Sequence, residues 1–98
     1  MSRNTPIDDV AVELKRVVHK VAEGLVDNPG KVFTSSLLVG YRNIIITITP
    51  PKNEVGKVLG KQGLHLAALD LIAQAIATKH QSRVTIFIDD GGRYERDG

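Results

Sequence analysis

The chain has 98 residues, which is enough for one domain, because a second core could not be closed with what remained. It contains no cysteine, so the sequence excludes a disulfide framework and a thiolate metal site. Its net charge of +2 is only mildly basic, so a polyanion would have to be bound by a local patch of cations rather than by the whole surface.

The first predicted element is a helix within residues 5–30. Thr5 is suited to cap it, Pro6 is suited to its first position, and the Asn-Pro-Gly run at 28–30 ends it. Apolar residues recur at helical spacing and predict one buried face, formed by Val10, Leu14, Val17, Val21 and Leu25. This helix is expected to be part of the scaffold.

The next segment, residues 32–49, has the period of two that is typical of β-strands on both sides of the short turn "GYRN". It therefore predicts a β-hairpin. Pro50 and Pro51 end the second strand, because proline cannot donate a hydrogen bond to a neighbouring strand.

Two helices and one strand are predicted to complete the domain. A short helix covers about 53–59, a longer one about 63–79, and the β-branched run "RVTIFID" forms a third strand. The predicted element order is thus αββααβ, with an ordered part of about 6–89 in a single domain that occupies 1–98. Residues 1–4 and 90–98 are expected to be mobile tails.

The sequence gives little support to an enzyme. The run "GKVLGKQ" differs from a phosphate-binding Walker loop, because only three residues precede its Gly-Lys pair and Gln62 stands where a hydroxyl should bind magnesium. Asp89 and Asp90 are adjacent, so in a strand they point to opposite faces and cannot act as a paired acid and base. The histidines show no ligand spacing: His19, His65 and His80. We predict no catalytic residue, no metal, no cofactor and no small-molecule substrate.

The break between the two later helices has a plausible use. Gly60 and Gly63 allow a tight turn and remove Cβ atoms, so that a sugar-phosphate backbone could approach. Lys61 and Gln62 add a cation and a neutral donor beside the positive end of the following helix. A turn that merely faces water would use the same residues, so the loop alone leaves both interpretations open.

The residues around this loop favour a binding site. A cation and a histidine, Lys57 and His65, lie close to it in the sequence, and an apolar wall for bases is predicted from Val55, Val58, Leu59 and Leu66.

The stretch "VGKVLGKQGLHL" is similar to the signature of KH domains, Val-Ile-Gly-x-x-Gly-x-x-Ile, with Leu59 in the place of the usual isoleucine. The αββααβ order resembles the type II, prokaryotic arrangement. The chain most resembles the small stand-alone bacterial KH proteins of the KhpA type, in which "LVDNP" before the first strand also recurs. This resemblance implies an α+β, two-layer type II KH fold with a three-stranded mixed sheet and three helices on one face.

The resemblance also implies a function. In the family, the Gly-x-x-Gly loop holds about four nucleotides of a single strand against an aliphatic groove. Carried over, the loop is Gly60 to Gly63, and the "GYRN" turn with Tyr41 and Arg42 matches the family's variable loop and would form a far rim. The resemblance further implies single-stranded RNA as the ligand, an RNA chaperone or post-transcriptional role in the bacterial cytoplasm, and a link with cell-wall and cell-length control. Because no aromatic residue lies near the loop, binding should be weak and loosely specific.

The last predicted helix suggests a second surface. Asp70, Gln74 and Thr78 form one narrow polar stripe, and apolar residues cover the rest. One interpretation is that the helix is buried on two sides by the first helix and the sheet. The other is a homodimer, or a heterodimer with a larger KH protein. A protein-interaction module with little or no RNA binding is accordingly the alternative function.

No apolar run approaches the roughly 20 residues that cross a bilayer, and the N-terminus lacks the pattern of a signal peptide. The sequence therefore predicts a cytoplasmic protein with no membrane partner.

Overall fold

The helix α1 (Ile7–Leu25) begins one residue later than the sequence predicts. Pro6 is its N-cap, with an extended backbone (φ −60°, ψ 143°), and no side chain caps the helix through a hydrogen bond at that position. The computed structural model describes residues 5–90, so the predicted tails at 1–4 and 91–98 lie outside the described residues. Asp90, assigned to a tail by prediction, is only 6% exposed.

The sheet has the order β1-β2-β3, with β1 (Phe33–Val39) and β3 (Arg83–Ile88) flanking β2 (Asn43–Thr49). β1 and β2 pair antiparallel as the predicted hairpin, whereas β2 and β3 are parallel. The strand period of two buries alternate residues of β2, because one face of the sheet packs on the helices. Ile44, Ile46 and Ile48 are 1%, 0% and 0% exposed.

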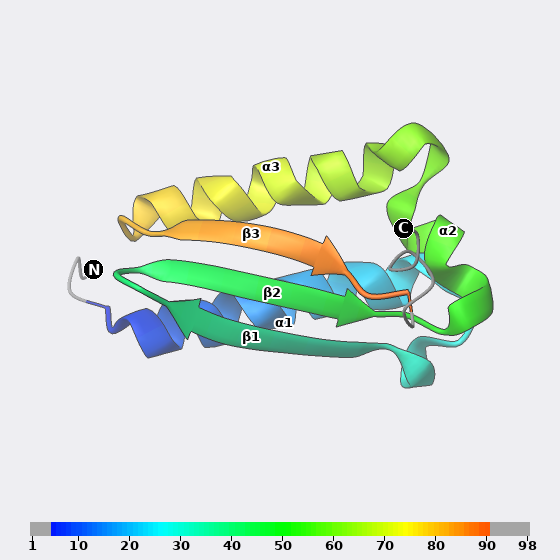
Figure 1. Ribbon diagram of the computed structural model, residues 1–98, viewed down its shortest axis with the longest axis horizontal. Helices are drawn as coiled ribbons and strands as arrows, with labels where there is room; N and C mark the ends of the chain where they lie inside the picture. The colour runs from blue at the N-terminus through cyan, green and yellow to red at the C-terminus, as the bar shows by residue number, and fades with distance from the viewer. Residues whose placement is uncertain (1–4, 91–98) are drawn as a thin grey trace.

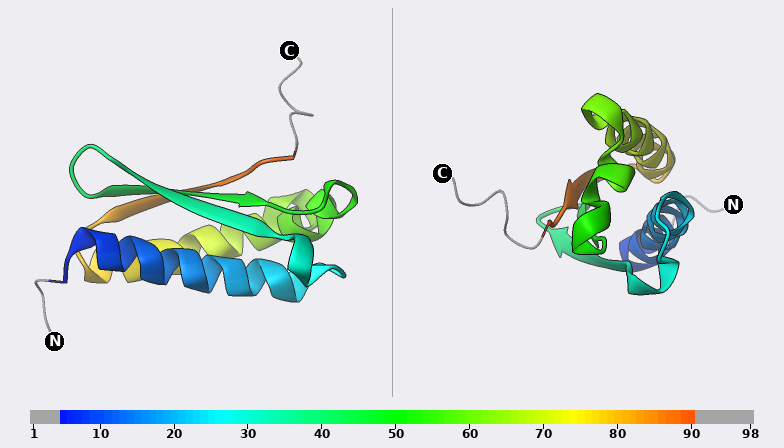
Figure 2. Two further views of the ribbon diagram at one scale, coloured as in Figure 1. Left: turned by 90° about the horizontal axis from the view of Figure 1, so that it is seen from below. Right: turned by 90° about the vertical axis from the view of Figure 1, so that its right-hand side faces the viewer.

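A parallel pair needs a crossover connection, and here α2 (Val55–Leu59) and α3 (Leu64–Lys79) provide it. Three short 3₁₀ turns lie between the elements, at Pro29–Lys31, Lys52–Glu54 and Lys61–Gly63. Figure 1 shows α1 behind the sheet and α3 beside β3, and Figure 2 shows both long helices on the same face of the sheet. The predicted α+β fold is confirmed: a three-stranded mixed sheet and three helices in the type II KH order αββααβ. That the whole chain is a single KH domain stays a prediction.

Helix α3 packs on β3 and on α1, but a large part of its surface stays uncovered. Its buried residues are Leu69, Ala73 and Ala77. Leu71 is 72% exposed and Ile72 56% exposed, so α1 and the sheet leave much of its apolar surface in contact with solvent. The interpretation that α1 and the sheet pack against this helix is therefore correct as to the contacts, but the two elements do not cover all of its apolar surface. Self-association through the exposed surface stays a prediction.

Candidate functional site

The loop between α2 and α3 has a backbone that requires glycine. Gly60 adopts φ 77° and ψ 170°, a region open essentially to glycine alone. Gln62 (φ 57°, ψ 26°) and Gly63 (φ 75°, ψ 16°) then follow in the left-handed helical region. The Gly60 N–H donates to Gly56 O at 2.8 Å, and the Gly63 N–H donates back to Gly60 O at 3.0 Å. These bonds fix the turn that reverses the chain between the two helices.

The missing Cβ atom at Gly60 makes room for another residue of the protein. A Cβ there would lie 2.5 Å from Cγ of His65 and 2.8 Å from its backbone nitrogen. The His65 ring lies within hydrogen-bond distance of α2, because Nδ1 is 2.8 Å from the Lys57 carbonyl oxygen. A carbonyl only accepts, so this bond places the proton on Nδ1. By contrast, a Cβ at Gly63 would meet nothing within 4 Å. Of the two glycines in the loop, Gly63 is therefore the one that leaves open space of the kind a sugar-phosphate backbone needs.

Lys61 and Gln62 are exposed at the tip of this turn. They directly precede α3, whose 16 residues direct the positive end of the helix dipole at the same point. The first N–H groups of a helix lack partners within the helix and suit an anionic oxygen. The structure thus brings together a cation, an amide donor and a helix N-terminus around one loop.

Lys57 belongs to a different arrangement from the one expected. Its ammonium donates to Asp27 Oδ2 at 2.6 Å and lies 3.8 Å from Glu54 Oε1. Glu54, which is 3% exposed, accepts from the Asp27 backbone N–H and from Nδ2 of Asn28, the latter at 2.6 Å. This cluster, Asp27, Asn28, Glu54 and Lys57, ties the start of α2 to the segment after α1.

Protonation in this cluster follows from its hydrogen bonds. The Asp27 N–H and the Asn28 amide hold the pKa of Glu54 below its usual value, with a smaller contribution from Lys57, although burial opposes them. The hydrogen bond to Asp27 raises the pKa of Lys57. Both charges are therefore retained at neutral pH, and they hold the helix that leads into the loop.

The predicted apolar wall is smaller than the sequence suggests. Val58 is 1% exposed and belongs to the core, and Val55 is 8% exposed. Leu59 and Leu66 are half-buried, so they supply the apolar surface that remains beside the loop. His65, whose ring packs against Gly60, also lines an apolar hollow of 180 Å³ between α1 and α3.

Arg42 lies far from the loop. Its guanidinium bonds the carbonyl oxygens of His80 and Gln81, just after the C-terminal end of α3, whereas the loop precedes the N-terminal end (Figure 1). The 16 residues of α3 rise about 24 Å. Arg42 therefore does not form a rim of the same groove, because the hairpin turn and the loop stand at opposite ends of the helix.

The sequence-based reasoning missed two groups of residues. The first is the pair Asp27 and Glu54. The only sequence signal for it was the stretch "LVDNP", which includes Asp27 and forms part of the family resemblance. The second is the set of polar residues around Arg42, described below. Both depend on contacts between segments that are distant in the sequence.

Within residues 5–90, no three His, Cys, Asp or Glu side chains gather as metal ligands would. Nor does any helix in that range combine the length and apolarity that a membrane crossing demands.

Comparison with known proteins relates the chain to one family. A family model described as "KhpA/KhpB, KH domain" matches residues 15–88. A protein of Caldanaerobacter subterraneus called "RNA-binding protein KhpA" is 36% identical over 72 residues, which cover 74% of this chain and 95% of that protein. Proteins of the same name from Aquifex aeolicus and Halalkalibacterium halodurans are 39% and 36% identical, over 76% and 79% of this chain and 94% and 100% of theirs. No solved structure matches.

Proposed function

The chain belongs to the KhpA/KhpB family of KH domains, and from this premise we propose that it binds single-stranded RNA without catalysing a reaction. The relatives named RNA-binding proteins support this proposal. The single observation that carries it is the loop from Gly60 to Gly63. There the exposed Lys61 and Gln62 stand at the N-terminus of a long helix, beside an open position at Gly63.

The loop is proposed to hold the RNA backbone, with Lys61 pairing with a phosphate and Gln62 donating to phosphate or sugar oxygens. Bases would rest on Leu59 and Leu66, which are aliphatic and offer no ring for stacking. Lys57 and Val55 would act indirectly, by fixing the position of α2. Binding of this kind is weak and loosely specific, which suits an RNA chaperone or a post-transcriptional regulator.

The experiment compares the Lys61→Asp/Gln62→Asp variant with the wild type in a titration of a fluorescent RNA oligonucleotide. The matched control is Lys15→Asn/Lys20→Asp, which changes the net charge equally at two exposed positions on α1. We expect the loop variant to bind at least about tenfold more weakly, since it replaces attraction by repulsion at the phosphate. The control should bind RNA like the wild type. If the loop variant is folded and binds as tightly as the control, the loop is not the binding site.

A second candidate function is protein interaction through α3. The observation that favours it is the exposed apolar surface of this helix, in which Leu64 is 62% exposed and Leu71 72% exposed. We propose that the surface pairs with a second copy or with a larger KH protein. A wild type that binds no RNA but sediments as a dimer would make this the main function.

The family resemblance extends the proposal to the cytoplasm of a bacterium and to cell-wall and cell-length control. Deletion of the gene, followed by measurement of cell length and complementation with the Lys61→Asp/Gln62→Asp variant, tests that extension. If this variant restores the cell length, control of cell length does not depend on RNA binding by the loop.

A further inference from the structure

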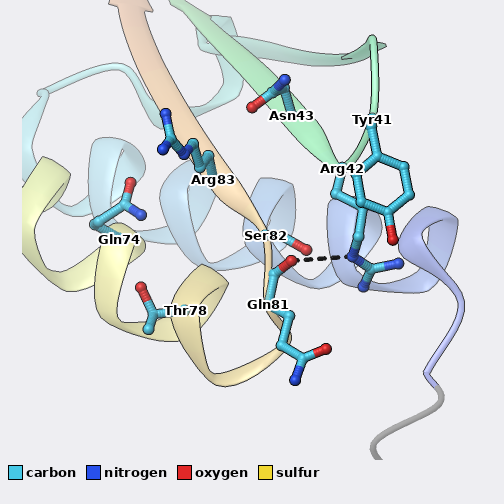
Figure 3. A pocket seen from close by; sticks show the side chains of 8 residues that line it. All are labelled: Tyr41, Arg42, Asn43, Gln74, Thr78, Gln81, Ser82 and Arg83. Carbon is cyan, nitrogen blue, oxygen red and sulfur yellow. Dashed lines mark hydrogen bonds between the residues drawn. The ribbon is translucent and has the colours of Figure 1, made fainter.

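A polar hollow of 460 Å³ lies at the end of the molecule opposite to the Gly60–Gly63 loop. Figure 3 shows that its lining side chains come from three segments: the β1–β2 turn, the C-terminal half of α3, and the stretch that leads into β3. The residues that matter here are Tyr41, Arg42, Gln74, Thr78, Gln81 and Arg83. The sequence-based reasoning placed Tyr41 and Arg42 in a rim of the RNA groove and Gln74 and Thr78 in the polar stripe of the last helix, and it did not bring them together in one site.

Arg42 is held rigidly at the edge of this hollow. Its Nε donates to Gln81 O at 3.0 Å and its Nη2 donates to His80 O at 2.8 Å, while its own carbonyl accepts from the Arg83 N–H at 3.0 Å. Arg42 (φ 60°) and Gln81 (φ 58°) both adopt the left-handed backbone conformation, which residues other than glycine usually avoid. A guanidinium has five N–H donors and these bonds use two, so the cation is fixed in place with donors left for an anion.

The other lining groups suit a nucleotide. Tyr41 is 86% exposed, so its ring is open to a base, and stacking on a ring tolerates every base. Gln74 and Gln81 carry amides that match base edges, and Arg83 supplies a second cation. Among the residues described, no carboxylate lines the hollow. Gln74 is itself positioned, because its Oε1 lies 3.4 Å from the Val84 backbone nitrogen that donates to it.

The position of the hollow relates it to the loop. Leu66, Asp70, Gln74 and Thr78 follow one another at the i, i+4 spacing of α3, so a single stripe leads from the loop to the hollow. Asp70 places a negative charge within this stripe, so the two cationic ends act as separate contacts rather than as one continuous track. They stand about 24 Å apart along the helix.

We propose that this hollow is a second nucleotide-binding site for the same RNA strand, in which Tyr41 stacks on a base and Arg42 and Arg83 contact phosphates. The inference rests on the proposed function of the loop, and it adds a dependence on length. A strand of about four nucleotides is held by the loop alone, whereas a longer strand reaches both ends of α3.

The test uses the Tyr41→Ser/Arg83→Gln variant, because both side chains are exposed and Arg42 keeps its bonds to the end of α3. The matched control, Phe33→Ser/Arg16→Gln, removes an exposed aromatic ring and an exposed arginine elsewhere, the ring being 72% exposed and the arginine side chain 70% exposed. Each protein is titrated with RNA of about four and of roughly 16 nucleotides, by fluorescence anisotropy and by amide chemical shifts, at several salt concentrations. Thermal unfolding checks that every variant is folded.

We expect the hollow variant to bind the longer RNA at least about fivefold more weakly, because stacking on one ring contributes this much or more. Its slope of log K against log salt should fall by about 0.7 for the phosphate contact of Arg83. The shorter RNA should bind it normally, and the control should bind both RNAs normally. In the wild type, the chemical shifts of the backbone amides of Gln81 and Arg83 should change when the longer RNA is added and should not change with the shorter one.

Unchanged binding of the longer RNA by the hollow variant would overturn the inference, as would equal weakening with both lengths. The first result would leave the loop proposal intact and would be expected if the hollow served a protein instead. If Lys61→Asp/Gln62→Asp changes neither titration while the hollow variant weakens the longer RNA, the loop proposal fails and the hollow is supported. A wild type that binds neither RNA would refute both.

Discussion

Alanine at Gly60 should destabilise the protein far more than alanine at Gly63, although both glycines flank the same loop. At Gly60 the backbone occupies a region open essentially to glycine, which costs about 1–3 kcal/mol for another residue. The new Cβ would also lie 2.8 Å from the backbone nitrogen of His65, a contact that side-chain rotation cannot relieve and that adds about 1–3 kcal/mol. The total is about 2–6 kcal/mol, offset by about 0.4–1 kcal/mol from the stiffer unfolded chain.

At Gly63 the cost is smaller, because a Cβ there meets nothing within 4 Å. Only the left-handed backbone remains, at about 1–2 kcal/mol, and the unfolded-chain effect offsets part of it. Since 1 kcal/mol corresponds to about 4–8 °C in Tm for a domain of this size, Gly63→Ala should lower Tm by roughly 5 °C. For Gly60→Ala, the middle of the range after the offset is about 3 kcal/mol, so Tm should fall by about 12–24 °C.

The assay is thermal and urea unfolding of both variants, together with Gly60→Ala/His65→Ala. Removing the imidazole relieves the contacts with Cγ and Cδ2 but leaves the one with the backbone nitrogen, so the double variant should recover only part of the loss. Equal stability of Gly60→Ala and Gly63→Ala would refute the reasoning. Full recovery in the double variant would show that the backbone contact contributes little.

Two further predictions concern the Glu54 cluster and the surface of α3. Folding lowers the pKa of Glu54, so the ionised carboxylate stabilises the folded state. This stabilisation is fully present above the usual glutamate pKa of about 4.3 and is lost as the pH falls through the lower pKa of the folded state. At neutral pH, Glu54→Gln should therefore have a Tm several degrees below that of the wild type. This difference in Tm should narrow between about pH 5 and pH 2. A difference that stays constant with pH would contradict the prediction. Leu71→Lys should leave Tm nearly unchanged, because the side chain is 72% exposed, and should shift any dimer to monomer in sedimentation velocity. A variant that remains dimeric would exclude this face as the dimer contact.

The fold could be predicted because its signals are local. Alternate isoleucines in β2 show which face is buried before any partner is known. In α1 the spacing placed Val10 and Leu14 correctly, but Val21, predicted on the same buried face, is 41% exposed, and Val18 and Ala22 are buried instead. The short helix α2 shows where this reasoning ends. From the sequence alone, Val58 could equally line a surface groove, yet it is 1% exposed, because it packs into the hydrophobic core.

The candidate site was predicted in part, for the same reason. Lys61 and Gln62 are where the turn chemistry predicts, since glycines define a turn without any tertiary contact. Lys57 was expected to contribute to the RNA site, but it pairs with Asp27, which precedes it by 30 residues. Arg42 was assigned to a far rim of the groove beside the loop, but the hairpin turn lies at the opposite end of α3, and only the direction of β2 relative to α3 decides that.

The crossover that carries the loop also determines when the site forms during folding. The β1–β2 hairpin joins neighbours in the sequence, whereas Ile46 must wait for Ile86, which is synthesised after the loop and all of α3. Until β3 docks, α3 lacks the strand that it packs on, and the turn at Gly60 is held only by local contacts with α2 and the start of α3. A nascent chain that ends before β3 would therefore carry the loop without its geometry. Competence to bind any ligand there should arise late and cooperatively, as the final strand closes the sheet.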